Sequence, residues 1–168
     1  MIALARASDA RRIAELQVRA WQAAYRGLLP DALLAGLSID GRERMWRKWN
    51  DAHPLRVIWL AERGDALTGF VATGPSRDDD AEASTGEVYA IYVEPALVGT
   101  GLGRRLFAHA ADALRAQGFT RATLWTLEGN ARTRRFYEAA DWRADGARKS
   151  ERWEDCEPVE VRYARALS

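Results

Sequence analysis

The spacing of apolar residues changes several times along the chain, and each change predicts a different element. Near the N-terminus the apolar positions mostly recur at the spacing of an amphipathic helix. Gly27 and Pro30 break that pattern, and a second helical region is interrupted before Asp40. The elements predicted here are a strand at 2–7 and helical segments at 10–24, 31–36 and 41–49.

After Pro54 the pattern becomes that of β-strands. Two apolar runs flank the turn signal Gly64-Asp65 and predict a hairpin, and a later run that ends before Pro95 is apolar on both faces, as in a buried strand. The predicted strands are 57–61, 66–73, 87–93, 120–127 and a closing pair at 142–150 and 158–166, with helices at 101–117 and 130–139. Without a linker or repeat, residues 1–168 predict one mixed α/β domain.

Charge and composition narrow the function only slightly. The formal net charge is +1, so no overall field favours nucleic acid or an anionic membrane. No apolar run approaches the ~20 residues that span a bilayer, and the N-terminus shows no secretory signal. The lone Cys156 excludes an intrachain disulfide, and with His53 and His109 it supplies too few ligands for a dedicated zinc site. We therefore expect a cytoplasmic protein that uses no metal.

A glycine-rich turn at 98–103 separates the buried strand from the following helix. Strand, tight turn and helix together aim free N–H groups and the positive end of a helix dipole at one point, which suits a phosphate. The order Gly99-x-Gly101-x-Gly103 does not match the dinucleotide fingerprint, and Arg104 stands where a P-loop needs lysine. A helix-starting turn without a ligand is the alternative interpretation.

A second strand-turn-helix block runs from 124 to 138. Asn130 is placed either to cap its helix or to offer its amide to a ligand. Phe136 and Tyr137 lie about two turns further on, where core packing is the alternative to a catalytic role.

Together these two blocks resemble the GNAT superfamily of N-acetyltransferases. Its members carry Gln/Arg-x-x-Gly-x-Gly/Ala after a central strand, matched here by 98–103, and an Asn-x(6)-Tyr block, matched by 130–137. The element order agrees along nearly the whole chain. The resemblance implies an α+β fold with a mostly antiparallel sheet of about seven strands flanked by four helices. It also implies transfer of an acetyl group from acetyl-CoA to a primary amine of a small molecule or peptide, without a metal.

The resemblance assigns roles to particular residues. Backbone amides should hold the pyrophosphate of coenzyme A at Val98, Gly99, Thr100, Gly101, Leu102, Gly103 and Arg104. Main-chain groups of Ile91, Tyr92 and Val93 should pair with the pantetheine arm as an added strand would. Asn130 should contact that arm near the thioester.

The same resemblance places two catalytic groups. Tyr137 is expected near the sulfur as the general acid. Glu87 lies eleven residues before Val98, where some members of the family have their general base. A solvated carboxylate at a strand end is the alternative interpretation of Glu87.

Three positions depart from the family or invite a second interpretation. Val98 replaces the usual Gln or Arg, which leaves the phosphate contacts to the backbone. Asp141 stands where the family often has glycine, and Asp tolerates a left-handed backbone better than most residues. The run Asp78-Asp79-Asp80 is expected to be a solvated loop, with a cation-binding patch as the alternative interpretation.

The acceptor and the partners are less determined. Trp21 and Tyr25 share a helix face, where they line an aromatic acceptor pocket or pack the helix on the sheet. The pattern Trp21-x-x-x-Tyr25-x-Gly27-x-x-Pro30 resembles one common in small-amine acetyltransferases, such as polyamine types. The alternatives are an acyl-CoA-binding sensor with little turnover, and an enzyme that docks on a protein through an apolar patch. The closing strands offer an edge for a homodimer.

Overall fold

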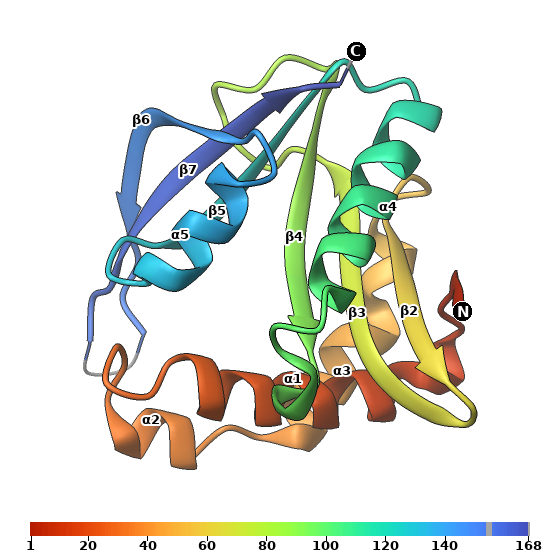
Figure 1. The fold of residues 1–168 in the computed structure, drawn as a ribbon, viewed down its shortest axis with the longest axis vertical. Helices are drawn as coiled ribbons and strands as arrows, with labels where there is room; N and C mark the ends of the chain where they lie inside the picture. Colours follow the sequence, from red (N-terminus) through yellow and green to blue (C-terminus); the bar gives the residue numbers. More distant parts are fainter. Residues whose placement is uncertain (154–155, 168) are drawn as a thin grey trace.

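A seven-stranded sheet runs through the centre of the molecule in the order β1-β2-β3-β4-β5-β7-β6 (Figure 1). The computed structural model describes residues 1–153 and 156–167. Only β4 and β5 are parallel neighbours, and the other pairs are antiparallel, as predicted. The strands are β1 (Ile2–Leu4), β2 (Val57–Arg63), β3 (Ala66–Pro75), β4 (Thr85–Val93), β5 (Arg121–Leu127), β6 (Arg143–Ser150) and β7 (Val159–Ala166).

Helices cover both faces of this sheet: α4 and α5 lie on one face, α1 and α3 on the other (Figure 1). Within the described residues the α-helices are α1 (Ala10–Ala24), α2 (Asp31–Ala35), α3 (Ile39–Trp49), α4 (Leu102–Ala116) and α5 (Ala131–Glu138). There are five rather than the expected four because the second helical region is split. Gly36 follows α2, and the Ser38 hydroxyl accepts from the Gly41 amide at 3.0 Å, which begins α3. No helix in this part of the chain is long and apolar enough to cross a membrane.

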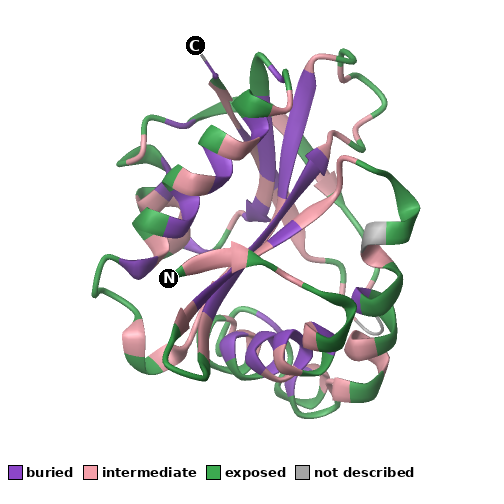
Figure 2. Cartoon of the chain, turned by 90° about the vertical axis from the view of Figure 1, so that its right-hand side faces the viewer, coloured by how far each residue is buried: buried purple, intermediate pink, exposed green. Residues whose placement is uncertain are grey.

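Each face of the sheet packs its own apolar core, and the buried positions gather along the strands (Figure 2). On the α4 side, Leu114 lies so close to β4 that a β-carbon on Gly86 would come within 2.7 Å of it. On the other side, the Trp46 ring of α3 meets Phe70 of β3 edge-on at 5.4 Å. The sheet is therefore fixed by helices from both sides.

The sheet opens between β4 and β5. These strands pair only from Thr85 to Glu87, opposite Arg121 to Thr123, and then diverge (Figure 1). A β-bulge accompanies the divergence: Thr73 pairs with Val88 and Ala72 with Ala90, so Tyr89 is one residue extra on β4. A bulge bends a strand and increases its twist. Beyond it, the side of β4 that faces β5 carries backbone groups that no described strand satisfies.

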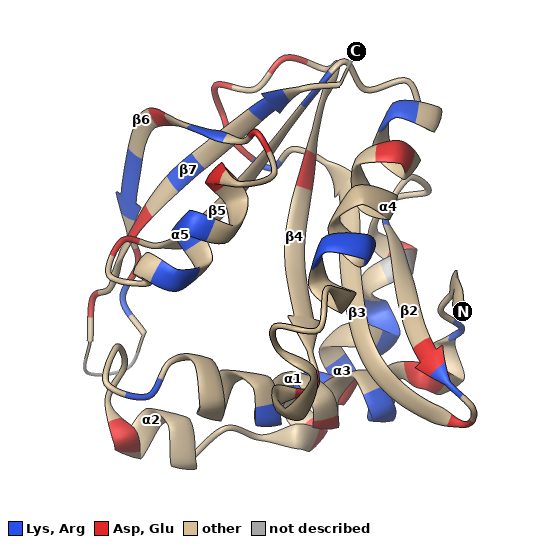
Figure 3. Ribbon diagram, in the orientation of Figure 1, with Lys and Arg blue, Asp and Glu red and all other residues tan. Residues whose placement is uncertain are grey.

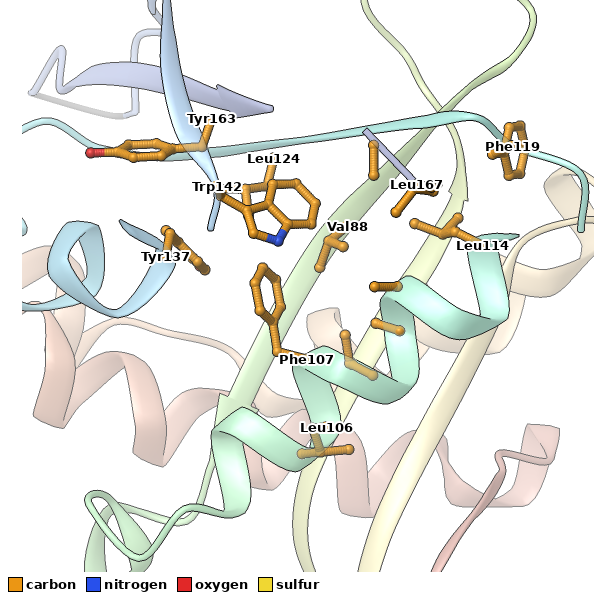
Figure 4. Packing of buried hydrophobic residues seen from close by; sticks show 14 of the residues in the cluster. Val88, Leu106, Phe107, Leu114, Phe119, Leu124, Tyr137, Trp142, Tyr163 and Leu167 are labelled. Carbon is orange, nitrogen blue, oxygen red and sulfur yellow. The ribbon is translucent and has the colours of Figure 1, made fainter. Parts of the chain in front are cut away.

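Asp141 ends α5 in the conformation anticipated from its residue type. It is the one non-glycine residue of the described chain with a positive φ, 64°. The next amide, that of Trp142, returns to the Tyr137 carbonyl at 3.1 Å. This turn places the fully buried Trp142 ring against Phe107 of α4, with ring centres 4.9 Å apart (Figure 4).

Substitution of Asp141 tests the importance of that backbone conformation. We expect Asp141→Val to lower the free energy of unfolding by about 1–2 kcal/mol, because a β-branched residue is strained at positive φ. Asp141→Gly should match or exceed the stability of the native protein, since glycine adopts this conformation freely. Urea denaturation followed by tryptophan fluorescence measures both. Equal stability of the valine and glycine variants would contradict the argument.

Candidate active site

The turn before α4 has a backbone that favours glycine. Gly99 and Gly101 have φ angles of 89° and 86°, where a β-carbon is strained. A β-carbon on either residue would meet no atom within 4 Å, so conformation rather than crowding requires glycine here. Open space therefore surrounds both of these positions.

The backbone amides at the start of α4 donate no hydrogen bond to the described part of the chain. The first helical hydrogen bond runs from the Arg105 amide to the Gly101 carbonyl at 3.1 Å. The amides of residues 101–104 come before that bond, and none of them donates a hydrogen bond to the described part of the chain. Exposed Arg104 and Arg105 add positive charge to this first turn (Figure 3). Val98 is 41% exposed and contributes no polar side chain, so the turn presents backbone donors to an anion.

Asn130 both caps α5 and keeps a donor for a ligand. Its Oδ1 accepts from the Thr133 amide at 3.2 Å, and the residue is 7% exposed. Because the oxygen is used by the cap, the side-chain amide nitrogen is the group left to contact a bound molecule. The two roles that the sequence left open are compatible.

Tyr137 is packed among aromatic rings but keeps an unengaged hydroxyl. Its ring centre lies 5.3 Å from that of Phe107 and 5.9 Å from that of Tyr163 (Figure 4). The hydroxyl makes no hydrogen bond within the described residues. Burial raises the pKa of Tyr137 well above its ordinary value, and the nearby Tyr92 hydroxyl raises it further. The phenol therefore holds its proton at neutral pH.

The Glu87 carboxylate is buried and is bound by an arginine. The side chain is 1% exposed, and Arg77 binds both of its oxygens: Nη2 donates to Oε1 at 2.6 Å, and Nε and the backbone amide donate to Oε2 at 3.2 and 2.9 Å. The interpretation of Glu87 as a solvated strand-end carboxylate is wrong, because the β-hairpin of β3 and β4 pairs Gly74 with Glu87 and so brings the following loop over it. Had the register of this hairpin been inferred from the sequence, it would have predicted Arg77 as the partner of Glu87.

Trp21, Tyr25 and Tyr92 gather on the α1 side of the opening. The Trp21 and Tyr25 rings meet edge-on at 5.0 Å, and Trp153 stacks on Trp21 at 5.6 Å. The Tyr25 and Tyr92 hydroxyls lie 3.2 Å apart, and burial raises the pKa of both. While Tyr92 points towards α1, the side chains of its neighbours in β4 pack on the α4 side. Nothing in the sequence pattern singled out the Tyr92 side chain as part of this pocket.

The aspartate run after β3 is exposed at Asp79 and Asp80, as expected of a solvated loop, and Asp78 and Asp80 also form ion pairs within the protein. Arg162 of β7 donates to Asp78 at 3.1 Å and to Asp80 at 2.6 and 2.8 Å, and Trp125 donates to Asp78 at 2.9 Å. Arg162 also binds Asp145 at 2.8 Å. The loop that carries Arg77 is thereby tied to β5 and β7 across the opening. The sequence did not predict these ion pairs, because Arg162 lies more than eighty residues from Asp78 and Asp80 along the chain.

The family model described as the acetyltransferase (GNAT) family matches residues 21–142. The chain belongs to this GNAT family. It is 31% identical over 128 residues to the uncharacterized N-acetyltransferase YuaI of Bacillus subtilis, a match that covers 75% of this chain and 70% of that relative. A mycothiol acetyltransferase of Beutenbergia cavernae is 47% identical over 99 residues, which is 59% of this chain but only 31% of that protein. The chain is thus a GNAT N-acetyltransferase.

Solved GNAT structures share the whole fold. The PaiA N-acetyltransferase of Thermoplasma acidophilum, solved with coenzyme A, superposes with a TM-score of 0.72 at 14% identity and covers 96% of each chain. A ribosomal-protein-alanine N-acetyltransferase of Brucella melitensis gives a TM-score of 0.76 at 17% identity over 99% of each chain. At these identities the likeness shows a common architecture.

The Arg77–Glu87 pair should contribute strongly to stability. We expect Arg77→Met to lower the free energy of unfolding by about 2 kcal/mol, because it leaves a buried carboxylate without its partner. Since Arg77 is itself 48% exposed, Glu87→Gln should cost less. In a double-mutant cycle the combined variant should be more stable than the sum of the single costs predicts, by about 1–2 kcal/mol. Additive costs in urea denaturation at pH 7 would show that the pair is not coupled.

Proposed function

We propose that this N-acetyltransferase moves the acetyl group of acetyl-CoA to a primary amine of a small molecule or a peptide. The observation that carries the proposal is the opening between β4 and β5. It brings together the free amides of the turn, the unpaired edge of β4 and the buried hydroxyl of Tyr137. Membership of the GNAT family and the coenzyme A bound in the PaiA structure support the same donor.

The residues present suit coenzyme A. The exposed turn offers backbone donors and no β-carbon at its two left-handed positions, which fits a pyrophosphate. The unpaired edge of β4 offers main-chain donors and acceptors to an extended pantetheine arm. The Asn130 amide nitrogen lies at the start of α5, on the far side of the opening. The residues proposed to bind the cofactor are Ile91, Tyr92, Val93, Val98, Gly99, Thr100, Gly101, Leu102, Gly103, Arg104 and Asn130.

In the reaction the bound acetyl-CoA supplies an acetyl group activated as a thioester. The acceptor amine forms the new C–N bond, and the C–S bond breaks. A main-chain N–H near Ile91, freed where β4 leaves β5, stabilises the negative charge that develops on the carbonyl oxygen. Tyr137 donates its proton to the departing sulfur, and its raised pKa keeps that proton in place until it is needed.

The amine must also lose a proton, and Glu87 is the proposed acceptor. Both of its oxygens are engaged by Arg77, so it receives the proton through a water or after the guanidinium has shifted. The same engagement favours the second candidate function, a protein that binds acyl-CoA with little turnover. The Glu87→Gln variant separates the two: a fall in kcat of about 100-fold or more supports the base.

Tyr137→Phe tests the general acid. We expect kcat to fall about 100-fold while the affinity for coenzyme A stays unchanged, because only the proton donor is lost. Tyr163→Phe is the matched control, since it removes a hydroxyl from the neighbouring ring and should leave kcat near that of the native protein. Free thiol release with acetyl-CoA measures turnover, and calorimetry measures affinity.

The pH profile of the native protein and the turnover of the Tyr137→Phe variant decide the role of this hydroxyl. Because the pKa of Tyr137 lies above the ordinary value of 10.0, the acid form persists, and kcat should show no alkaline fall from this group up to that pH. Unchanged turnover in Tyr137→Phe would remove Tyr137 as the acid. A native protein that binds coenzyme A but acetylates no amine would favour the binding module.

Gly101→Ala tests the turn. Alanine at φ 86° is strained, and relief of that strain reorients the amides, so we expect coenzyme A to bind about 10-fold more weakly. Gly64→Ala is the matched control: its φ is 59°, it also has no atom within 4 Å of a built β-carbon, and it lies in the β2–β3 hairpin. Both variants should lose similar stability. Equal coenzyme A affinity in the two, measured by isothermal titration, would contradict the proposed site.

A further inference from the structure

On the α1 side of the opening lies a cation that has no counter-ion among the described residues. Arg42 of α3 is half-buried, and its guanidinium carbon lies 4.4 Å above the centre of the Trp21 ring. Among the described residues no carboxylate or carbonyl accepts a hydrogen bond from its side chain. Removal from water lowers the pKa of Arg42, and the nearby Tyr92 and Tyr25 oppose that shift only in part. By contrast, Arg11 at the other side of α1 binds three carboxylates.

The neighbours of Arg42 are also donors. The indole nitrogen of Trp21 is buried and lies beside the Tyr92 hydroxyl oxygen, which is the acceptor within its reach. The Tyr25 and Tyr92 hydroxyls share one hydrogen bond, which uses one of their two protons and leaves the other to donate. The Arg42 guanidinium and the remaining hydroxyl proton of this pair therefore have no acceptor among the described residues. Buried donors of this kind are rare unless a ligand or water satisfies them.

The chemistry of this group selects its ligand. A guanidinium binds a carboxylate through two parallel hydrogen bonds, and the aromatic ring beneath it holds it in plane. The position is also informative, because Tyr92 lies close enough to Tyr137 to influence its ionisation. A group held at Arg42 is thus on the acceptor side of the opening, near the proposed reacting centre.

One carboxylate already lies near Tyr25 and Tyr92. Glu160 of β7 affects the ionisation of both Tyr25 and Tyr92, and Lys149 stands 3.7 Å from it. Burial raises the pKa of Glu160. It makes no ion pair with Arg42, and its negative charge attracts a positively charged amine. A ligand with one ammonium and one carboxylate complements the charges of Glu160 and Arg42, whereas a second ammonium, as in a polyamine, would be repelled by Arg42.

We propose that Arg42, held over the Trp21 ring and assisted by the Tyr25–Tyr92 hydroxyl pair, binds a carboxylate of the acceptor, so that the acceptor is a small amino acid-like molecule. This inference rests on the proposed N-acetyl transfer and specifies the substrate class of the same site. The acetylated nitrogen is the primary amine of that molecule. The carboxylate is a binding group only and takes no part in bond formation.

The experiment compares acceptors that differ only in this carboxylate. The probes are free amino acids, each paired with its own carboxamide, which keeps the amine and removes the negative charge. Thiol release with acetyl-CoA gives kcat and KM for each member of a pair. We expect kcat/KM for the preferred acid to exceed that for its amide about 10- to 100-fold in the native protein.

Variants then connect that preference to one side chain. Arg42→Gln should raise KM for the acid about 10- to 100-fold, leave the amide unchanged and preserve coenzyme A affinity. Arg42→Lys should recover part of the acid preference, because it restores charge without the planar fork. Arg44→Gln is the matched control, an exposed arginine two positions along the same helix. It should behave as the native protein.

Two results would overturn the inference. One is amine acetylation with equal kcat/KM for acids and amides; this leaves the proposed function intact. The other is an equal loss for acid and amide in Arg42→Gln, which would assign Arg42 a merely structural role. If no amine is acetylated, the proposed function fails, and calorimetric titration of the amino acids into the coenzyme A-loaded native and Arg42→Gln proteins decides the matter. Binding only to the native protein upholds the carboxylate site, and binding to neither refutes it.

Discussion

The loss of pairing between β4 and β5 is the constraint on which the whole site depends. A sheet gains stability from each backbone hydrogen bond, yet these two parallel strands pair with each other over only three residues each. The extra residue in β4, Tyr89, sits where the divergence begins. Because β5 continues its pairing with β7 and β4 with β3, the sheet stays intact on both sides while its middle opens. Unsatisfied main-chain groups are thereby held on a rigid edge, which a loop would not provide.

The opening is kept in place by charge as much as by packing. Glu87 is the last residue of β4 that pairs with β5, and Arg77 forms a salt bridge with its carboxylate. The same loop is tied to β7 by the bonds from Arg162 to Asp78 and Asp80, so one chain segment bridges the two separated strands. Tertiary ion pairs of this sort are costly to bury and costly to break once formed. They explain how a sheet with a missing central pairing keeps a fixed geometry.

The two sides of the opening have different chemical character. On the α4 and α5 side there are backbone donors at a helix start and a phenol embedded among aromatic rings, which suits an elongated anionic cofactor. On the α1 and α3 side, Arg42, Trp21 and two tyrosine hydroxyls form a compact group of donors around aromatic surface. Tyr92 and Tyr137 approach each other from these opposite sides. The proposed donor and acceptor sites are therefore built by different helices on the two sides of β4.

The sequence by itself determined the features that depend on neighbouring residues. The order of helices and strands, the glycine turn with its positive φ angles and the left-handed end of α5 at Asp141 all follow from local spacing and from the backbone freedom of particular residue types. Only the tertiary structure decided which charges are paired. Asp78 and Asp80 proved to be partners of Arg162, whereas Arg42 has no carboxylate partner among the described residues. An ion pair depends on the distance between two side chains in space, and the sequence around an arginine does not show whether a carboxylate lies near it. For the same reason the pattern predicted the glycine turn, and only the packing of α1 against α3 and β4 showed that Arg42, Trp21 and Tyr92 lie together.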